Sequence, residues 1–261
     1  MFIDTHCHLS VKDYDDIDKI IKDDLLEVDK IIISGCDYDG IFESLEIANN
    51  YDNIFVTIGY HPDQVDVVKD TDLENLEKLL KNKKVVGIGE IGLDYHYYDT
   101  KKEKQIELFE KQLELAVKYD MPVVIHSRDA TKDTINTLKK YKVKGIIHAF
   151  SGSLETAEIY IKMGFLLGIG GVITFKNSKL YEVVKKIGVE NIVLETDSPY
   201  LTPHPFRGKQ NSSKYIPVIA QKIAEVTNNS IEKVGEITTQ NASSLFDLDS
   251  KKWYSKFDNR G

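Results

Sequence analysis

The chain has 261 residues, of which 41% are hydrophobic and 29% charged, and its formal net charge is −8 at pH 7. This is an ordinary composition for a soluble globular protein, and its negative charge argues against a protein that holds nucleic acid on a broad basic surface. The longest apolar runs are far shorter than the roughly 20 residues needed to cross a bilayer, so we expect no membrane span.

The N-terminus and the cysteines predict a cytoplasmic protein. Met1 is followed directly by FID, without the basic stretch, apolar segment and cleavage site of a secretory signal. Cys7 and Cys36 lack CxxC spacing and give no disulfide framework for a chain of this size. We interpret both cysteines as buried packing residues of a protein in a reducing compartment.

Eight short apolar runs follow one another along the chain and predict strands. They are residues 2–6, 30–35, 54–59, 85–91, 123–127, 145–150, 165–173 and 191–196. Helical periodicity follows each of the first seven, at residues 16–28, 39–50, 72–82, 101–120, 131–141, 153–163 and 178–188. After the eighth strand we expect a helix at 215–228 and two shorter segments at 230–238 and 240–248.

Strand followed by helix, eight times over, predicts an α/β fold of the (β/α)8 TIM-barrel type, with an open doubly wound sheet as the alternative. No proline-rich linker or low-complexity segment divides the chain. We therefore predict one domain over residues 1–261, ending in a polar C-terminal tail at 249–261.

Residues able to bind metals end five of the predicted strands. They are His6 and His8, Glu90, His126, His148 and Asp197, while His61 follows a sixth strand. The carboxyl ends of the strands of a parallel barrel meet at one rim, where its active sites lie. Because side chains alternate along a strand, His6 and His8 point to one side and Cys7 to the other. We therefore predict a shared metal site at this rim.

Four imidazoles and two carboxylates exceed the three protein ligands of a typical mononuclear catalytic zinc site. They suit two divalent ions bridged by one carboxylate, an arrangement used in phosphoryl chemistry. The ligand types leave Mg, Mn and Zn open, and also Co or Ni. Two such ions beside two carboxylates would give a site of about +2, so an acidic chain could still act on phosphates.

Six motifs together resemble the TatD family of metal-dependent deoxyribonucleases, within the amidohydrolase superfamily. They are DTHCH at 4–8, GYHP at 59–62, GEIGLD at 89–94, PVVIHSR at 122–128, HAFSG at 148–152 and ETDSPYL at 195–201. The resemblance covers about residues 1–248. Where that family usually continues with Asn, an acidic residue and Pro after RGK, this chain has residues 210–213, QNSS, so the shape of that loop end is left open.

The resemblance implies a role for each ligand. His6, His8 and Asp197 would hold one ion, His126 and His148 the other, and Glu90 would bridge them. Asp197 and Glu90 would be catalytic, with Asp197 serving the water nucleophile. His61 and Arg207 would lie near the substrate phosphate.

Three further carboxylates are candidates to support these ligands. Alternation places Asp4 below His6, Glu195 below Asp197 and Asp94 on the side of Glu90. An unpaired carboxylate inside a barrel is costly, and orienting an imidazole N–H would satisfy it. For Glu195 direct contact with an extra ion is a further alternative.

The leading hypothesis is a TatD-type deoxyribonuclease, 3′–5′ exonuclease-like, that acts on strand ends or single strands as a monomer and forms no stable complex with nucleic acid. The alternative is a barrel of the same superfamily that hydrolyses a C–N, ester, lactone or aminoacyl-tRNA bond. Glu90 stands where a carbamylated bridging lysine could have ended its strand, which favours the nuclease branch. A binding protein without catalysis is a third possibility.

Overall fold

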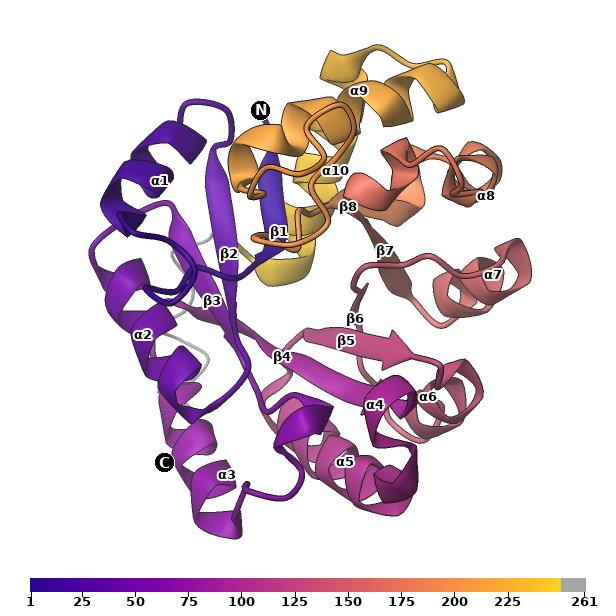
Figure 1. Ribbon diagram of the computed structural model, residues 1–261. Coiled ribbons are helices and arrows are strands. Elements are labelled where there is room, and N and C mark those ends of the chain that lie inside the picture. The colour runs from indigo at the N-terminus through magenta and orange to yellow at the C-terminus, as the bar shows by residue number, and fades with distance from the viewer. Residues whose placement is uncertain (250–261) are drawn as a thin grey trace.

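Eight parallel strands form the centre of the fold, in chain order around a barrel (Figure 1). The computed structural model describes residues 1–249, without the side chains of 97–99, so the predicted tail lies outside the described residues except for Asp249. The strands are β1 (Ile3–Cys7), β2 (Lys30–Gly35), β3 (Ile54–Ile58), β4 (Val85–Asp94), β5 (Val123–Arg128), β6 (Gly145–Ile147), β7 (Phe165–Ile169) and β8 (Ile192–Leu194). Each pairs in parallel with the next.

Helices surround this sheet on the outside (Figure 1). They are α1 (Ile17–Asp24), α2 (Tyr38–Asn49), α3 (Asp70–Leu79), the short α4 (Tyr95–Tyr98), α5 (Lys102–Tyr119), α6 (Thr131–Leu138), α7 (Leu154–Lys162), α8 (Leu180–Ile187), α9 (Ile216–Thr227) and α10 (Ile231–Phe246). The predicted (β/α)8 TIM barrel is confirmed. Among residues 1–249, no helix combines the length and apolar character that a bilayer crossing requires.

The barrel interior is filled by one apolar side chain from each of six strands. They are Ile3, Ile32, Val86, Val124, Ile146 and Val193. Ala242 and Phe246 of α10 pack on this cluster together with Leu248. Helix α10 therefore closes the end of the barrel opposite the predicted metal site.

The prediction of two short segments at 230–238 and 240–248 is wrong, because α10 runs without a break over Ile231–Phe246. Gly235 weakens the helical pattern in the sequence, yet it has a packing role. A Cβ at this position would lie 2.8 Å from the carbonyl oxygen of Met1. The glycine lets α10 approach the start of the chain.

Three predicted strands end earlier than their apolar runs suggest. Strand β7 stops at Ile169, before the 3-10 helix η3 (Gly171–Thr174). Strand β6 stops at Ile147 and β8 at Leu194. Ala149 and Asp197 follow them with φ values of 45° and 54°, in the left-handed region, which takes the backbone out of the extended conformation. His148 and Asp197 therefore lie just beyond their strands, on segments that turn over the rim.

The first and last strands meet at a seam held by hydrogen bonds around Asp4. The backbone N–H of Asp197 donates to the carbonyl of His6 at 2.9 Å, and that of His8 donates to the carbonyl of Ser198 at 2.7 Å. One oxygen of Asp4 accepts from the N–H groups of His6 (3.2 Å) and Thr196 (3.0 Å), and the other from the hydroxyls of Thr196 (2.6 Å) and Ser213 (2.7 Å). Asp4 is fully buried, and burial raises its pKa to about 7 although these hydrogen bonds oppose the rise.

We expect Asp4→Ala to lower the free energy of unfolding by about 3 kcal/mol or more, because it leaves several buried donors at the seam without an acceptor. Asp4→Asn should cost only about 1 kcal/mol, since its oxygen can face the two N–H groups while both hydroxyls accept from its NH2. Urea unfolding of metal-free protein, followed by circular dichroism, measures both changes, with the exposed Asp39→Ala as control. Equal losses for Ala and Asn would contradict this account of the seam.

Comparison of the native protein with Asp4→Asn tests the titration of Asp4. Its pKa of about 7 in the folded protein lies above the ordinary value of 3.8, so the folded state binds the proton more tightly. The native chain should lose stability from this group as the pH rises from about 4 to about 7. Asp4→Asn cannot titrate and should lack this part of the pH dependence.

Candidate metal centre

Alternation along the strands brings the predicted ligands to the barrel mouth. Counting by two from the interior residues Val124 and Ile146 leads to His126 and His148, and counting by four from Val193 leads to Asp197. On β1 a register shift between Asp4 and Cys7 places Thr5 and His6 together opposite a single residue of β2, Ile32. This bulge lets Ile3 and His6 both face the interior.

The bulge corrects the predicted position of Asp4. Strict alternation placed it below His6, with its carboxylate on an imidazole. It lies instead at the seam, against Thr196 and Ser213, and contacts His6 through the backbone N–H. Asp4 thus holds the main chain that carries His6.

Glu90 lies at the centre of the cluster, 4% exposed, with a different group of imidazoles facing each of its oxygens. Oε2 lies 3.4 Å from Nε2 of His6 and 3.9 Å from Nε2 of His8. Oε1 lies 2.6 Å from Nδ1 of His126 and 2.9 Å from Nε2 of His148. One carboxylate therefore faces two sets of donor atoms.

The set around Oε2 has the spacing of ligands that share one ion. Asp197 Oδ1 lies 3.5 Å from Nε2 of His6 and 3.4 Å from Nε2 of His8. Ligand atoms about 2.1 Å from an ion at tetrahedral angles stand roughly 3.4 Å apart. The donor set fits a divalent cation without rearrangement.

His6 gives independent support for this fit. Its side chain is fully buried, and neither ring nitrogen has a hydrogen-bond partner among the described residues. A buried polar atom without a partner costs free energy. A metal ion at Nε2 would relieve that cost, and His6 belongs to two of the three groups of donor atoms close enough to share an ion.

Two of the three supporting carboxylates lie beside an imidazole. Asp94 Oδ2 lies 3.1 Å from Nε2 of His126, on the ring edge opposite Glu90. Glu195 Oε1 lies 3.5 Å from Nδ1 of His148 and accepts the N–H of Ala149 at 2.7 Å. The hydrogen bond with Asp94 fixes the ring orientation of His126. Nδ1 of His148 lies near Glu195 but has no hydrogen-bond partner among the described residues.

Two glycines make room for this arrangement. A Cβ on Gly168 would lie 2.1 Å from Oε2 of Glu195, so only glycine leaves space for that carboxylate. Gly92 has a φ of 147°, and a Cβ there would lie 2.0 Å from the carbonyl oxygen of His126.

Charges within the cluster shift the pKa values in opposite directions. Burial raises the pKa of Glu90, but His148, His126 and His6 outweigh it and hold the pKa well below its usual range. Burial lowers the pKa of His148, but Glu90 and Glu195 outweigh it and raise the pKa well above the ordinary value. In the metal-free protein, the positive charge of protonated imidazoles balances the negative charge of the buried carboxylates.

His61 lies closer to the ligands than predicted, whereas Arg207 lies apart. Nε2 of His61 is 3.8 Å from Oε1 of Glu90, and His61 forms a possible ligand group with Glu90 and His126. The guanidinium of Arg207 lies 4.3 Å from the ring centre of Phe175, and Nη1 donates to the carbonyl of Thr202. Arg207 does not line the cavity that contains the ligands.

That cavity, which we call the metal cavity, has a volume of about 790 Å³ and is lined by donor residues of both sets, although not by His6. It is also lined by Lys12 and Arg128, two cations that the sequence analysis did not single out. Arg128 could have been found, because it lies two residues beyond His126 on the same strand.

Cys36 also lines the metal cavity, so its interpretation as a packing residue is wrong. Its sulfur lies 3.6 Å from Oε2 of Glu90 and 4.0 Å from Nδ1 of His8. The signal was present in the sequence, because Cys36 follows β2 four residues after the interior residue Ile32. Cys7, in contrast, is fully buried in the core between strands and helices.

Comparisons with known proteins agree with the fold and the motifs. The sequence profile of the family described as TatD related DNase matches residues 3–247. The chain is 43% identical over 253 residues to the uncharacterized metal-dependent hydrolase YabD of Bacillus subtilis (strain 168), covering 94% of this chain and 99% of that protein.

Two solved structures extend the comparison. The crystal structure of YjjV, a TatD homolog from Escherichia coli K12, matches with a TM-score of 0.86 and 32% identity, covering 94% of this chain and 98% of that one. A TatD family hydrolase from Entamoeba histolytica matches with a TM-score of 0.82 at 24% identity, covering 94% and 97%, and supports the fold alone.

Metal binding should release protons, because the pKa values of His8, His126 and His148 are raised in the metal-free protein. Below those pKa values protons compete with the metal. The affinity for Zn or Mn should therefore rise with pH, by about tenfold per pH unit for each proton released. Calorimetric titration in buffers of different ionisation enthalpy counts these protons.

His148→Gln should reduce the proton count, whereas the exposed His204→Gln serves as the matched control. A pH-independent affinity, or equal proton release from both variants, would contradict this description of the cluster.

Iodoacetamide should alkylate Cys36 and spare Cys7 in the native protein, because Cys36 lines the metal cavity and Cys7 is 0% exposed. Burial raises the pKa of the Cys36 thiol, so the reaction should accelerate as the pH rises. Bound metal should slow it by restricting access to the cavity. Peptide mass spectrometry measures both sites, with Cys36→Ser as the blank; equal labelling of Cys7, or no protection by metal, would refute the placement.

Proposed function

The chain belongs to the TatD-related DNase family of metal-dependent hydrolases, and we propose that it cleaves phosphodiester bonds in DNA with the help of two divalent ions. The observation that carries the proposal is the position of Glu90. Each of its two oxygens faces a separate group of imidazoles, as expected of a carboxylate that bridges two ions.

We propose that the ligands divide between the two ions as the family resemblance implies. His6, His8 and Asp197 would hold one ion with Oε2 of Glu90, and His126 and His148 the other with Oε1. His61 lies near enough to the second group to join it or to contact the phosphate. Two ions bound there would lower the pKa of a water molecule and neutralise charge on the phosphate oxygens.

Asp197 is the proposed proton acceptor. Its side chain is 17% exposed, at the metal cavity, while that of His6 beside it is fully buried. Burial raises the pKa of Asp197, but His8, His148 and His6 outweigh it and keep the pKa below its ordinary value. The carboxylate is therefore ionised at neutral pH and able to take a proton from an attacking water.

Lys12 and Arg128 are the proposed contacts for the phosphate itself. Both line the metal cavity, and both are exposed. Arginine matches phosphate oxygens with its planar fork, while lysine acts as a point charge. A phosphodiester carries a negative charge that these cations can contact, whereas an amide or ester group carries none.

Strand ends or single strands are the proposed form of the substrate, since the ligands lie inside the barrel mouth where an intact duplex enters less readily. Two free cysteines, one of them in the metal cavity, suit a reducing compartment such as the cytoplasm. We propose a monomer that releases its product and forms no lasting complex with nucleic acid.

Glu90→Gln should lower metal-dependent cleavage of single-stranded DNA by at least about 100-fold, because it removes the charge that both donor sets share. Glu236→Gln is the matched control, since Glu236 is exposed on α10 and pairs only with Lys233 among the described residues. The assay uses purified protein loaded with Mn, Mg or Zn, on DNA, RNA and a panel of amide, lactone and aminoacyl ester substrates.

Undiminished cleavage by Glu90→Gln would end the two-ion proposal. Turnover of a carbonyl substrate, with none of DNA, would reassign the centre to the other branch of the superfamily.

A further inference from the structure

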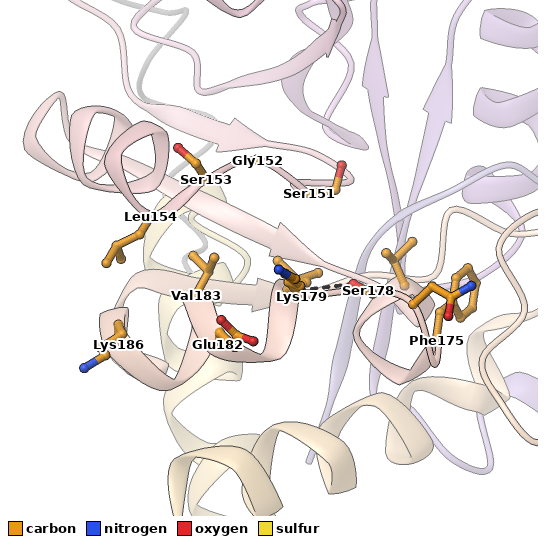
Figure 2. A pocket seen from close by; sticks show the side chains of 13 residues that line it. Ser151, Gly152, Ser153, Leu154, Phe175, Ser178, Lys179, Glu182, Val183 and Lys186 are labelled. Carbon is orange, nitrogen blue, oxygen red and sulfur yellow. Dashed lines mark hydrogen bonds between the residues drawn. The ribbon is translucent and has the colours of Figure 1, made fainter.

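A second cavity of about 680 Å³ lies beside the metal cavity, and we call it the side groove. It lies between the loop that leads from β6 into α7 and the segment from η3 (Gly171–Thr174) into α8 (Figure 2). Ser151 lines both cavities, so the side groove adjoins the metal cavity at that residue. Figure 2 shows Ser151 and Phe175 toward the barrel strands, and Leu154 and Lys186 at the far end.

The side groove has an apolar floor and a polar rim. Leu154, Val172, Phe175, Leu180 and Val183 supply the apolar surface. The rim carries serine hydroxyls, the amide of Asn177, the cations of Lys179 and Lys186 and one acid, Glu182. Its net charge is therefore positive, in a chain whose formal charge is −8.

Arg207, which the family resemblance places near the substrate phosphate, lies beside the side groove. Its guanidinium stacks on Phe175, 4.3 Å from the ring centre, and Phe175 lines the side groove. A phosphate contact of Arg207 would therefore lie beside the groove and away from the scissile bond. The guanidinium also braces the ring in place.

We propose that the side groove holds the single strand that continues from the cleaved bond, with a base against Phe175 and backbone phosphates near Lys179, Lys186 and Arg207. This inference rests on the proposed function. Stacking on aromatic side chains beside a track of cations is the general means by which proteins bind single strands without reading their sequence. The volume lies within the roughly 300–1,000 Å³ of pockets that enclose a whole small molecule, which is enough for a nucleotide.

The test measures binding of 5′-fluorescein oligothymidylates of 4, 8 and 12 nucleotides by fluorescence anisotropy. Every protein carries Glu90→Gln, so that no strand is cut during the measurement. The groove variant is Lys179→Ala with Lys186→Ala. The matched control is Lys176→Ala with Lys185→Ala, which removes the same charge from the same two segments at residues that do not line the groove.

The groove variant should weaken binding of the 12-mer more than that of the 4-mer. It should also reduce the slope of log Kd against log salt concentration by about 1.4, since each phosphate contact on a single strand contributes roughly 0.7. The control pair should change neither quantity. Phe175→Leu should weaken 12-mer binding by at least about fivefold while the salt slope stays the same, because it removes stacking and no charge.

Equal effects of the two lysine pairs, or a groove variant that weakens the 4-mer and the 12-mer alike, would overturn the proposal. The native enzyme separates this failure from that of the proposed function. If it cuts DNA while the groove variant binds all lengths normally, only the side groove assignment fails. If it cuts no phosphodiester at all, the proposed function fails, and the groove proposal with it.

Discussion

Burial of the Glu90 carboxylate among imidazoles is the constraint on which the rest of the site depends. A carboxylate 4% exposed at the end of a barrel needs positive charge around it, because its hydration has been lost. Protonated histidines can supply that charge in the absence of metal, and cations can replace the protons. The same surroundings thus serve both states, and the site can form in the fold before an ion arrives. This explains why donor atoms already stand at distances suited to a shared ion.

Two departures from regular strand geometry shape the seam that carries His6, His8 and Asp197. The bulge in β1 turns His6 inward without moving Ile3 out of the interior. The left-handed residue Asp197 ends the extended backbone after β8 and returns the chain over the rim. Asp4 joins the two segments, since it accepts hydrogen bonds from the backbone of both His6 and Thr196. The seam of the barrel is therefore also the support of one half of the proposed metal centre.

Much of this site follows from the sequence because strand alternation is a local rule. His126 and His148 lie two residues beyond interior side chains, and nothing between them disturbs the count. The same rule applied to β2 would have found Cys36, which was assigned to packing only because cysteine is usually buried for that reason. The rule failed for Asp4, because a bulge depends on how β1 pairs with β2 and leaves no mark in the sequence of β1 itself.

The prediction of two segments in place of helix α10 is wrong for a related reason. Gly235 lowers helix propensity, and its compensating contact with Met1 lies at the other end of the chain. The stacking of Arg207 on Phe175 joins two loops far apart in sequence, and no periodicity predicts such a contact.

The overall charge adds a further condition on how an anionic substrate could be held. A surface at −8 repels a polyanion, so long-range attraction gives little help to the first encounter. Favourable interactions must then be concentrated where the strand lies. Salt screening limits the electrostatic attraction of each cation to about 10 Å at ordinary ionic strength. On our proposal, Lys12 and Arg128 at the metal cavity and Lys179 and Lys186 at the adjoining side groove would provide such local contacts. Under this proposal, a strand would gain affinity only where it reaches these cations, and a shortened product would lose contacts and dissociate. Such weak, local binding would suit repeated cleavage of strand ends better than storage or sequence-specific binding of nucleic acid.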